Sequence, residues 1–286
     1  MNPLPKIILF AILACVTSSC YSKPVIFNDV KDLNFVNNHL AKNTNPEDKV
    51  LVIFDIDDTL LEAVNFVGSN KWYNWQRGKE VFDPDGTKIS ISDHEVFYCM
   101  FSTLGTLFDL GTSKLTQPDA AQLILDLDGH DLMLLTSRTY SFRRATEREL
   151  KINGFDFSSK HLLNNGQTLE FDFYDNSRTD RVTYQRGLVM VSGLNKGLVL
   201  RVILAKIAKQ YDAIYFVDDS HINIVQMQAE WKDDPTRFNI FHYTRIDRAI
   251  SKEEIAQSNQ AKKIFDDFLK TAYPDRFETF ASNKCR

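Results

Sequence analysis

The stretch VLVIFDIDDTL at residues 50–60 joins five consecutive apolar residues directly to a group of acidic ones. A short, continuous apolar run that contains β-branched residues is typical of a strand buried on both faces of a parallel sheet. Similar runs occur at residues 132–135 and 213–217, and polar residues follow each of them. The sequence therefore predicts three parallel strands whose carboxyl ends carry polar side chains.

Helical patterns lie between these strands, at residues 119–127, 142–152 and 198–209. This alternation of strands and helices predicts an α/β fold with a doubly wound parallel sheet. In such sheets, ligands bind at the carboxyl ends of the strands. The polar residues that follow the three strands are therefore the first candidates for a functional site.

Two segments interrupt the alternation. A strand-helix-strand unit needs roughly 30 residues, and the chain between the first two strands is much longer, so residues 62–117 are predicted to be an insertion. Its aromatic residues, Trp72 and Trp75 among them, are expected either to pack the core of the insertion or to close over a ligand. At residues 170–192, two segments in which apolar and polar residues alternate flank a turn-prone stretch, which predicts a β-hairpin.

Composition places the chain among ordinary soluble globular proteins. It has 286 residues, of which 43% are hydrophobic and 25% charged, with a net charge of −4. These values exclude a disordered chain, a collagen-like repeat and a multi-span membrane protein. Because the chain lacks a strong positive field, we do not expect it to bind nucleic acids in general or anionic membranes. Arg143, Arg144 and Arg148 are interpreted as a solvated helix face.

The first 20 residues have the order of a secretory signal peptide. Lys6 precedes an apolar run at residues 7–16, small residues follow, and the run is too short to span a bilayer. We therefore expect residues 21–286 to form the exported protein. Cys20 resembles the lipidated cysteine of a bacterial lipobox, although Thr17 stands where that pattern has an aliphatic residue. Ordinary cleavage and lipidation at Cys20 both stay open, and a lipid anchor is the one membrane contact we expect.

Export would place Cys99 and Cys285 in an oxidising compartment, where they could form a disulfide. Two free, buried thiols are equally consistent with the sequence.

The strongest chemical signal is the pair Asp55 and Asp57, directly after the first strand. Two carboxylates that face one pocket are unfavourable unless a cation or a proton compensates their charge. Asp218 and Asp219 follow the third strand, and Asn223 comes soon after them. Carboxylate and amide oxygens are ligands that Mg²⁺ prefers. The sequence thus indicates a cation site at the carboxyl ends of the strands. His221 is interpreted as a hydrogen-bonded or solvated residue outside this site.

Three further polar or charged residues are candidates for the same site. Thr136 follows the second strand and could cap the next helix. Lys196 follows Asn195, a favourable N-cap, and a cation at a helix N-terminus opposes the helix dipole. Its position suggests that carboxylates or a phosphate lie nearby. Arg138 could contact a substrate phosphate or pair with Asp58.

The order of these residues resembles that of a known superfamily. Asp55-x-Asp57-x-Thr59, then Thr136, then Lys196, then Asp218-Asp219 is similar to the four ordered motifs of the haloacid-dehalogenase superfamily of phosphohydrolases. The resemblance spans nearly all of the chain after the signal peptide. It implies that residues 62–117 are a cap at the superfamily's first cap position and that the hairpin at residues 170–192 is at the second. With its export signal and modest cap, the chain resembles periplasmic acid phosphatases more than cytosolic sugar phosphatases. We expect it to belong to a poorly characterised family of proteins of the bacterial periplasm or cell envelope.

The resemblance also implies roles for the residues. Asp55 would attack phosphorus, and Asp57 would protonate the leaving oxygen and then activate water. Mg²⁺ would be bound by Asp55, the backbone carbonyl of Asp57, and Asp218. Thr136 would hydrogen-bond a phosphoryl oxygen, and Lys196 would stabilise the covalent intermediate.

Around these residues, Thr59, Asp219 and Asn223 are expected to support the metal site, with Asp219 orienting Lys196 or a metal-bound water. The implied substrate is a phosphate monoester, either a small molecule or a protein. Two alternatives stay open: a phosphotransferase or mutase, and a non-enzymatic envelope or effector protein that keeps the fold as a binding scaffold.

Overall fold

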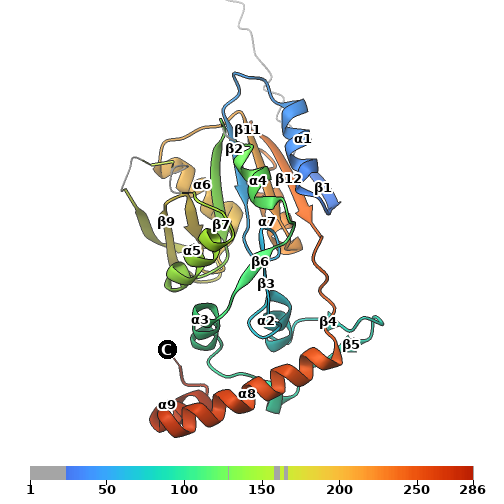
Figure 1. The fold of residues 1–286 in the computed structure, drawn as a ribbon. Coiled ribbons are helices and arrows are strands. Elements are labelled where there is room, and N and C mark those ends of the chain that lie inside the picture. Colours follow the sequence, from blue (N-terminus) through green and yellow to red (C-terminus); the bar gives the residue numbers. More distant parts are fainter. Residues whose placement is uncertain (1–23, 128, 158–161, 164–166, 286) are drawn as a thin grey trace, which may run out of the picture.

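A central sheet of eight strands dominates the protein, seen in a computed structural model that describes residues 24–127, 129–157, 162–163 and 167–285 (Figure 1). The expected export signal at residues 1–20, including Cys20, lies outside the described residues. The strand order is β1-β12-β11-β2-β7-β10-β9-β8, and the first six of these strands run parallel. The fold is therefore α/β with a large, mostly parallel sheet.

The three apolar runs form the middle of this sheet, as β11, β2 and β7, and their registers are continuous. Next to β10, β9 runs antiparallel to the other strands, and it pairs with the edge strand β8 in a hairpin, within the segment where the alternating pattern lies. The strands of the sheet are β1 (Val25–Val30), β2 (Val50–Phe54), β7 (Asp131–Thr136), β8 (Leu169–Tyr174), β9 (Thr179–Gln185), β10 (Leu188–Met190), β11 (Ala213–Asp218) and β12 (Arg237–Tyr243).

Helices cover both faces of the sheet, and each face has its own apolar core. Side chains of α1 (Leu33–Asn43), α4 (Ala120–Leu125) and α5 (Arg143–Ile152) pack into one core. Those of α6 (Lys196–Lys206) and α7 (His221–Trp231) pack into the other. Because every residue of β2 is buried, its sequence is apolar on both faces, as the uninterrupted run predicts.

The chain from β3 to β6, inserted between β2 and α4, forms a second lobe, which lies beyond the carboxyl ends of the parallel strands (Figure 1). An antiparallel pair, β3 and β6, leads out of the sheet and back into it. We call this part, together with the C-terminal helices described next, the lobe. Its elements are β3 (Leu61–Ala63), α2 (Asn70–Gln76), β4 (Val81–Phe82), β5 (Lys88–Ile89), the short 3-10 helix Asp93–Glu95, α3 (Met100–Leu110) and β6 (Ser113–Leu115).

The C-terminal helices α8 (Lys252–Ala272) and α9 (Pro274–Ala281) complete the lobe, which the sequence reasoning did not anticipate. The indole N–H of Trp72 donates to Ser258 Oγ of α8 at 2.9 Å, and both Trp72 and Trp75 are buried. These two tryptophans therefore pack the core of the lobe. No helix among the described residues is both long and apolar enough to cross a membrane.

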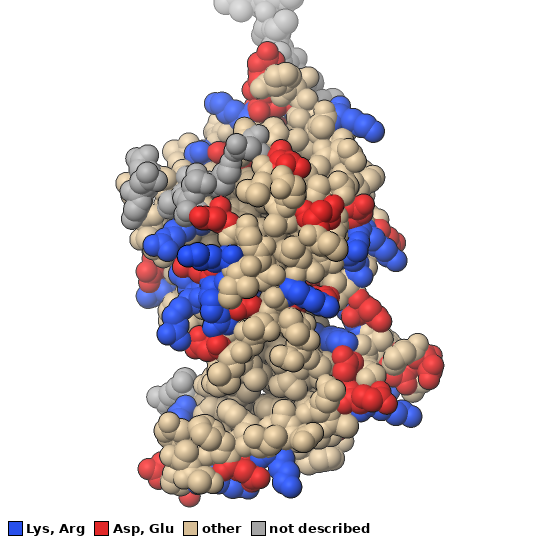
Figure 2. Space-filling model, in the orientation of Figure 1, with Lys and Arg blue, Asp and Glu red and all other residues tan. Residues whose placement is uncertain are grey.

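The interpretation of three arginines on α5 as a solvated face was wrong for two of them. Arg143 donates to Thr183 Oγ1 of β9 at 2.8 Å, and Arg148 donates to carbonyl oxygens at the C-terminal end of α3. The side chain of Arg144 is 86% exposed. Planar guanidinium groups satisfy several carbonyls at once, which explains their use at element ends. Figure 2 shows acidic and basic side chains interspersed over the face in view.

A disulfide joins Cys99, just before α3, to Cys285 after α9, with Cα atoms 5.4 Å apart. It closes a loop of 186 residues and ties the C-terminal helices to the insertion. A covalent link over such a long loop removes much conformational freedom from the unfolded chain.

Replacing both cysteines, Cys99→Ser with Cys285→Ser, should lower the free energy of unfolding by roughly 2–5 kcal/mol. Urea unfolding in the absence of reductant measures the change. Reduction should destabilise the original protein by a similar amount and leave the double variant unaffected. An intact mass without reductant that shows two free thiols would contradict the disulfide.

Candidate functional site

Two carboxylates lie side by side where the central strands end. Asp55 follows β2 directly, and Asp218 is the last residue of β11. These strands are parallel neighbours with Phe54 paired to Val217, and the Asp55 amide donates to the Val217 carbonyl at 2.9 Å. Both side chains are buried, 5% and 0% exposed. The register of the sheet thus forces two acidic groups together in the interior.

Lys196 bridges this pair. Its Nζ lies 2.6 Å from Asp55 Oδ1 and 2.7 Å from Asp218 Oδ2, and its side chain is fully buried. Asn195 caps α6 by accepting from the amides of Gly197 and Leu198, which fixes where the helix begins and hence where the lysine stands. The structure therefore brings together Asp55, Asp218 and Lys196, which are far apart in sequence.

Asp218 is held by two more groups. The Ser220 amide donates to Asp218 Oδ1 at 2.8 Å, and Asn223 Nδ2 lies 3.0 Å from both carboxylate oxygens. Asn223 projects from the first turn of α7. The orientation of Asp218 is thus set from three sides, with Asn223 in contact with it.

Asp219 is buried beside this pair but has other partners. Arg248 hydrogen-bonds both its carboxylate and its backbone carbonyl, and Asn70 Nδ2 of α2 lies 3.4 Å from Asp219 Oδ2. The described contacts of Lys196 go to Asp55 and Asp218 instead, so the expectation that Asp219 orients Lys196 is not what the structure shows. His221 is exposed, and its ring packs 5.7 Å from that of His242.

The loop after Asp55 turns sharply. The amides of Thr59, Leu60 and Leu61 all donate to the carbonyl of Ile56, and Asp58 has a φ of +56°. A left-handed conformation is more accessible to aspartate than to most residues, which suits Asp58 to this turn. Thr59 is fully buried, and its hydroxyl has no hydrogen-bond partner among the described residues.

Arg138 pairs with Asp57, not with Asp58 as one interpretation of the sequence had it. Its Nε lies 2.9 Å from Asp57 Oδ2 and its Nη2 lies 2.7 Å from Asp57 Oδ1. Thr136, at the end of β7, accepts from the Arg138 amide at 3.2 Å, so its hydroxyl shapes the turn that presents the arginine.

Burial and neighbouring charges shift the pKa values of the acidic residues at the strand ends and of Lys196. Burial raises the pKa of Asp55 to about 7, because the ammonium of Lys196 only partly offsets burial and the charges of Asp218 and Asp57. Burial and the charge of Asp57 raise the pKa of Asp58 to about 6, and burial beside Asp218 and Asp55 raises the pKa of Asp219 well above its usual range. Lys196 has a raised pKa, since the charges of Asp218 and Asp55 outweigh its burial.

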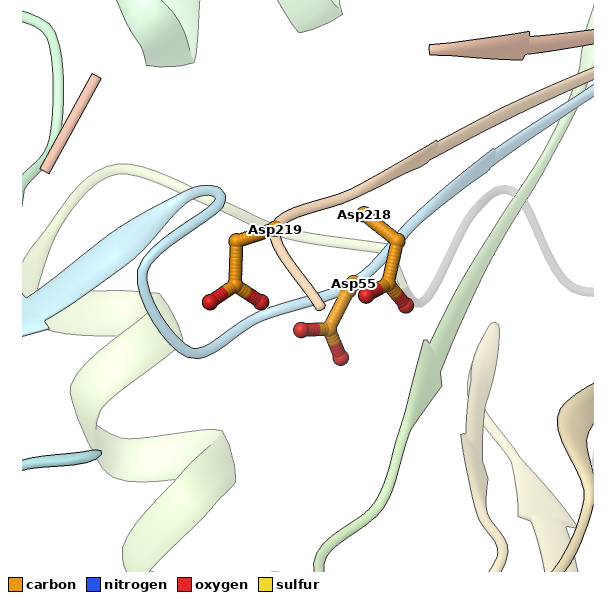
Figure 3. Close-up of side chains that lie close together, drawn as sticks. All are labelled: Asp55, Asp218 and Asp219. Carbon is orange, nitrogen blue, oxygen red and sulfur yellow. The ribbon is translucent and has the colours of Figure 1, made fainter. Parts of the chain in front are cut away.

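Three carboxylates are placed to share a cation. One oxygen each from Asp55, Asp218 and Asp219 lies within 4.8 Å of the others, and Figure 3 shows them converging from the ends of β2 and β11. Lys196 contributes one positive charge to this group and Arg248 another, at Asp219. Two cationic side chains thus face three carboxylates, and burial, more than the neighbouring acids, raises the pKa values of Asp55 and Asp219. Hard oxygen donors in this number suit Mg²⁺.

A pocket lies next to these residues, between the sheet and the lobe. Asp57, Asp58 and Arg138 line it from the loops that follow the strands. The lobe contributes the other walls, which include polar Asn65, Ser69 and Asn70 and apolar Leu107 and Phe108.

Sequence reasoning missed Asn70 and Arg248. Asn70 also donates to Asp58 Oδ2 at 3.0 Å, so it links the lobe to two of the loops that carry the acids. Neither residue belongs to a local pattern that marks a site, because their positions depend on how α2 and the chain after β12 pack.

Replacing the buried lysine, Lys196→Met, should lower the free energy of unfolding by about 3–5 kcal/mol, because it leaves two buried carboxylates without their ammonium. Urea unfolding in a chelating buffer measures this. Lys232→Met, at a largely exposed position, serves as the control and should change little. If the Lys196 variant were as stable as the original protein, the buried ion-pair triad would be refuted.

The raised pKa values predict a pH dependence for the ion-free protein. The folded state keeps protons on Asp55 and Asp58 that the unfolded chain has released, so the contribution of these two groups to stability should fall as the pH rises from about 4 to about 7. A Mg²⁺ ion held by these carboxylates would compete with those protons, so its stabilising effect should grow with pH. At pH 7.5 and a hundredfold excess over Kd, the thermal midpoint should rise by about 5–10 °C.

Thermal scans with Mg²⁺ and with chelator at pH 5 and 7.5 test this. Asp218→Asn should abolish most of the shift, while Asp233→Asn, at an exposed position, should keep it. An equal shift in both variants would show that the ion binds elsewhere.

Comparison with known proteins identifies a family but no function. A family described as "Protein of unknown function (DUF2608)" matches residues 29–272, from β1 to the end of α8, and so includes both the sheet and most of the lobe. No curated protein and no solved structure matches the chain. Because the match covers most of its length, the protein belongs to the DUF2608 family.

Proposed function

We propose that the protein is a Mg²⁺-dependent phosphatase of the haloacid-dehalogenase type that hydrolyses phosphate monoesters. The observation that carries this proposal is the buried triad of Asp55, Asp218 and Lys196, with hydrogen-bonding distances of 2.6 and 2.7 Å from the ammonium. A nucleophilic carboxylate beside a fixed cation, at the carboxyl ends of parallel strands, suits attack on a phosphoryl group.

The residues present fit a magnesium ion. Asp55, the backbone carbonyl of Asp57, and Asp218 would hold it, and the buried Asp219 offers a further oxygen nearby. Mg²⁺ bound there would neutralise charge on the phosphoryl oxygens. Asn223 and the Ser220 amide, which both donate to Asp218, would keep that ligand in place.

The chain's own groups then account for the reaction. Asp55 attacks phosphorus, the bond to the leaving oxygen breaks, and an aspartyl-phosphate forms. Asp57 enters the reaction as the protonated acid and gives its proton to the leaving oxygen. As the carboxylate that Arg138 contacts at both oxygens, it then removes a proton from the water that releases inorganic phosphate, which restores the acid. Lys196 stabilises the negative charge of the intermediate. Thr136, at the end of β7, donates its hydroxyl to a phosphoryl oxygen.

The lobe would act as the cap. Its residues and those of the strand-end loops line one pocket next to Asp57, where a leaving group would sit. We also propose that the enzyme is exported and acts in the bacterial periplasm or cell envelope. The Cys99–Cys285 disulfide supports this location, because disulfides persist in oxidising compartments.

Hydrolysis of an aryl phosphate such as p-nitrophenyl phosphate tests the proposal. Activity should require Mg²⁺, and Asp55→Asn should lower kcat by at least about a thousandfold, because the amide cannot act as the nucleophile. Asp233→Asn is the matched control and should keep full activity.

Full activity of Asp55→Asn would overturn the assignment of the nucleophile. If no phosphate ester in a broad panel is turned over while Mg²⁺ still stabilises the protein, the catalytic proposal fails and a binding scaffold replaces it.

A further inference from the structure

Arg138 makes a planar, two-point contact with Asp57. Its Nε and Nη2 donate to the two carboxylate oxygens at 2.9 and 2.7 Å. Such paired hydrogen bonds fix the plane of the carboxylate as well as its position. The Arg138 side chain is 6% exposed, whereas that of Asp57 is 33% exposed. Both residues line the pocket, but the carboxylate is the more exposed of the two and the arginine supports it from a mostly buried position.

Two further contacts fix the position of the Arg138 guanidinium. Its Nη1 lies 2.9 Å from Thr146 Oγ1 on α5, and its guanidinium lies over the ring of Phe108, 4.1 Å from the ring centroid. Phe108 belongs to α3 of the lobe, so the arginine touches the strand-end loop, the α/β core and the lobe at once. Arg148 keeps α3 and α5 together by donating to the Phe108 carbonyl at 2.8 Å.

We propose that Arg138 is a positioning residue that sets the orientation of the Asp57 carboxylate and makes it depend on α3 of the lobe. This inference rests on the proposed function, in which Asp57 handles the proton of the leaving group.

The contacts argue against a direct role for Arg138 on substrate phosphate. All three of its side-chain nitrogens donate to protein oxygens, and the ring of Phe108 covers a face of the guanidinium. Leu107 and Phe108 also line the pocket beside Asp57. A leaving group that displaces α3 would therefore move Arg138, and through it Asp57.

A double-mutant cycle on activity tests the first part of the proposal. Arg138→Lys keeps the charge but cannot form the two-point contact, so kcat should fall by about tenfold to a hundredfold with KM nearly unchanged. In the Asp57→Asn background, the same change should cost less than about twofold, because Arg138 acts through Asp57. Additive losses together with a raised KM would overturn the proposal and make Arg138 a substrate ligand.

Thr146→Val and Phe108→Leu test the connection to the core and the lobe. Each should lower kcat severalfold in the original background and have little effect when Asp57 is already Asn. Arg144→Gln, on the exposed side of α5, is the control and should not change kcat. Unchanged kcat in Phe108→Leu would overturn the dependence on α3, and unchanged kcat in Thr146→Val would overturn the support from α5.

Unfolding experiments on the same variants do not depend on activity. Thermal midpoints should shift non-additively for the pair Arg138 and Asp57 and for the pair Arg138 and Phe108. Additive shifts would overturn the inference even in an active enzyme. An inactive protein with non-additive shifts would refute the phosphatase proposal, and with it the catalytic role of Arg138, while the physical coupling stands.

Discussion

The contact between Lys196 and the two buried carboxylates, Asp55 and Asp218, is the interaction on which the rest of the site depends. Two anions at the ends of neighbouring strands could not be buried without it, because desolvating a charge costs several kcal/mol even after relaxation. The ammonium of Lys196 does not cancel the effect of burial, since the pKa of Asp55 stays raised. A third carboxylate, that of Asp219, is buried beside the pair. The site therefore folds with three buried carboxylates close together, an arrangement that could hold a metal ion.

The lobe shows how a site can be enclosed by parts of a chain that are far apart in sequence. The insertion after β2 supplies Asn70 and Phe108, and the chain after β12 supplies Arg248, which holds Asp219. Helix α8 and the disulfide then fix these two parts to each other. Because residues from both parts reach the acidic loops, the arrangement of the lobe and the geometry of the acids are mechanically linked.

Local chemistry explains why much of the core could be predicted. The apolar run at residues 50–54 is a strand buried on both faces, and the helix predicted from residue 198 begins at Lys196, next to the cap that Asn195 provides. The hairpin was visible because alternation has the period of a strand. The shape of the lobe was not visible, because α8 packs through contacts such as Trp72 with Ser258, which join residues 186 positions apart.

The sequence by itself determined which groups stand at the strand ends, because strand boundaries follow from local hydrophobic pattern and the parallel order brings their carboxyl ends to one edge. That was enough to single out Asp55, Asp57, Thr136 and Asp218, whereas Lys196 was marked by its place after a helix cap and by the superfamily resemblance. Only the tertiary structure decided the partners of those groups. Arg138 contacts Asp57 instead of Asp58, and Arg248 and Asn70 contact Asp219, because each partner is chosen by packing between distant elements. Hydrogen bonds of this kind depend on distances of a few ångströms, which no local pattern encodes.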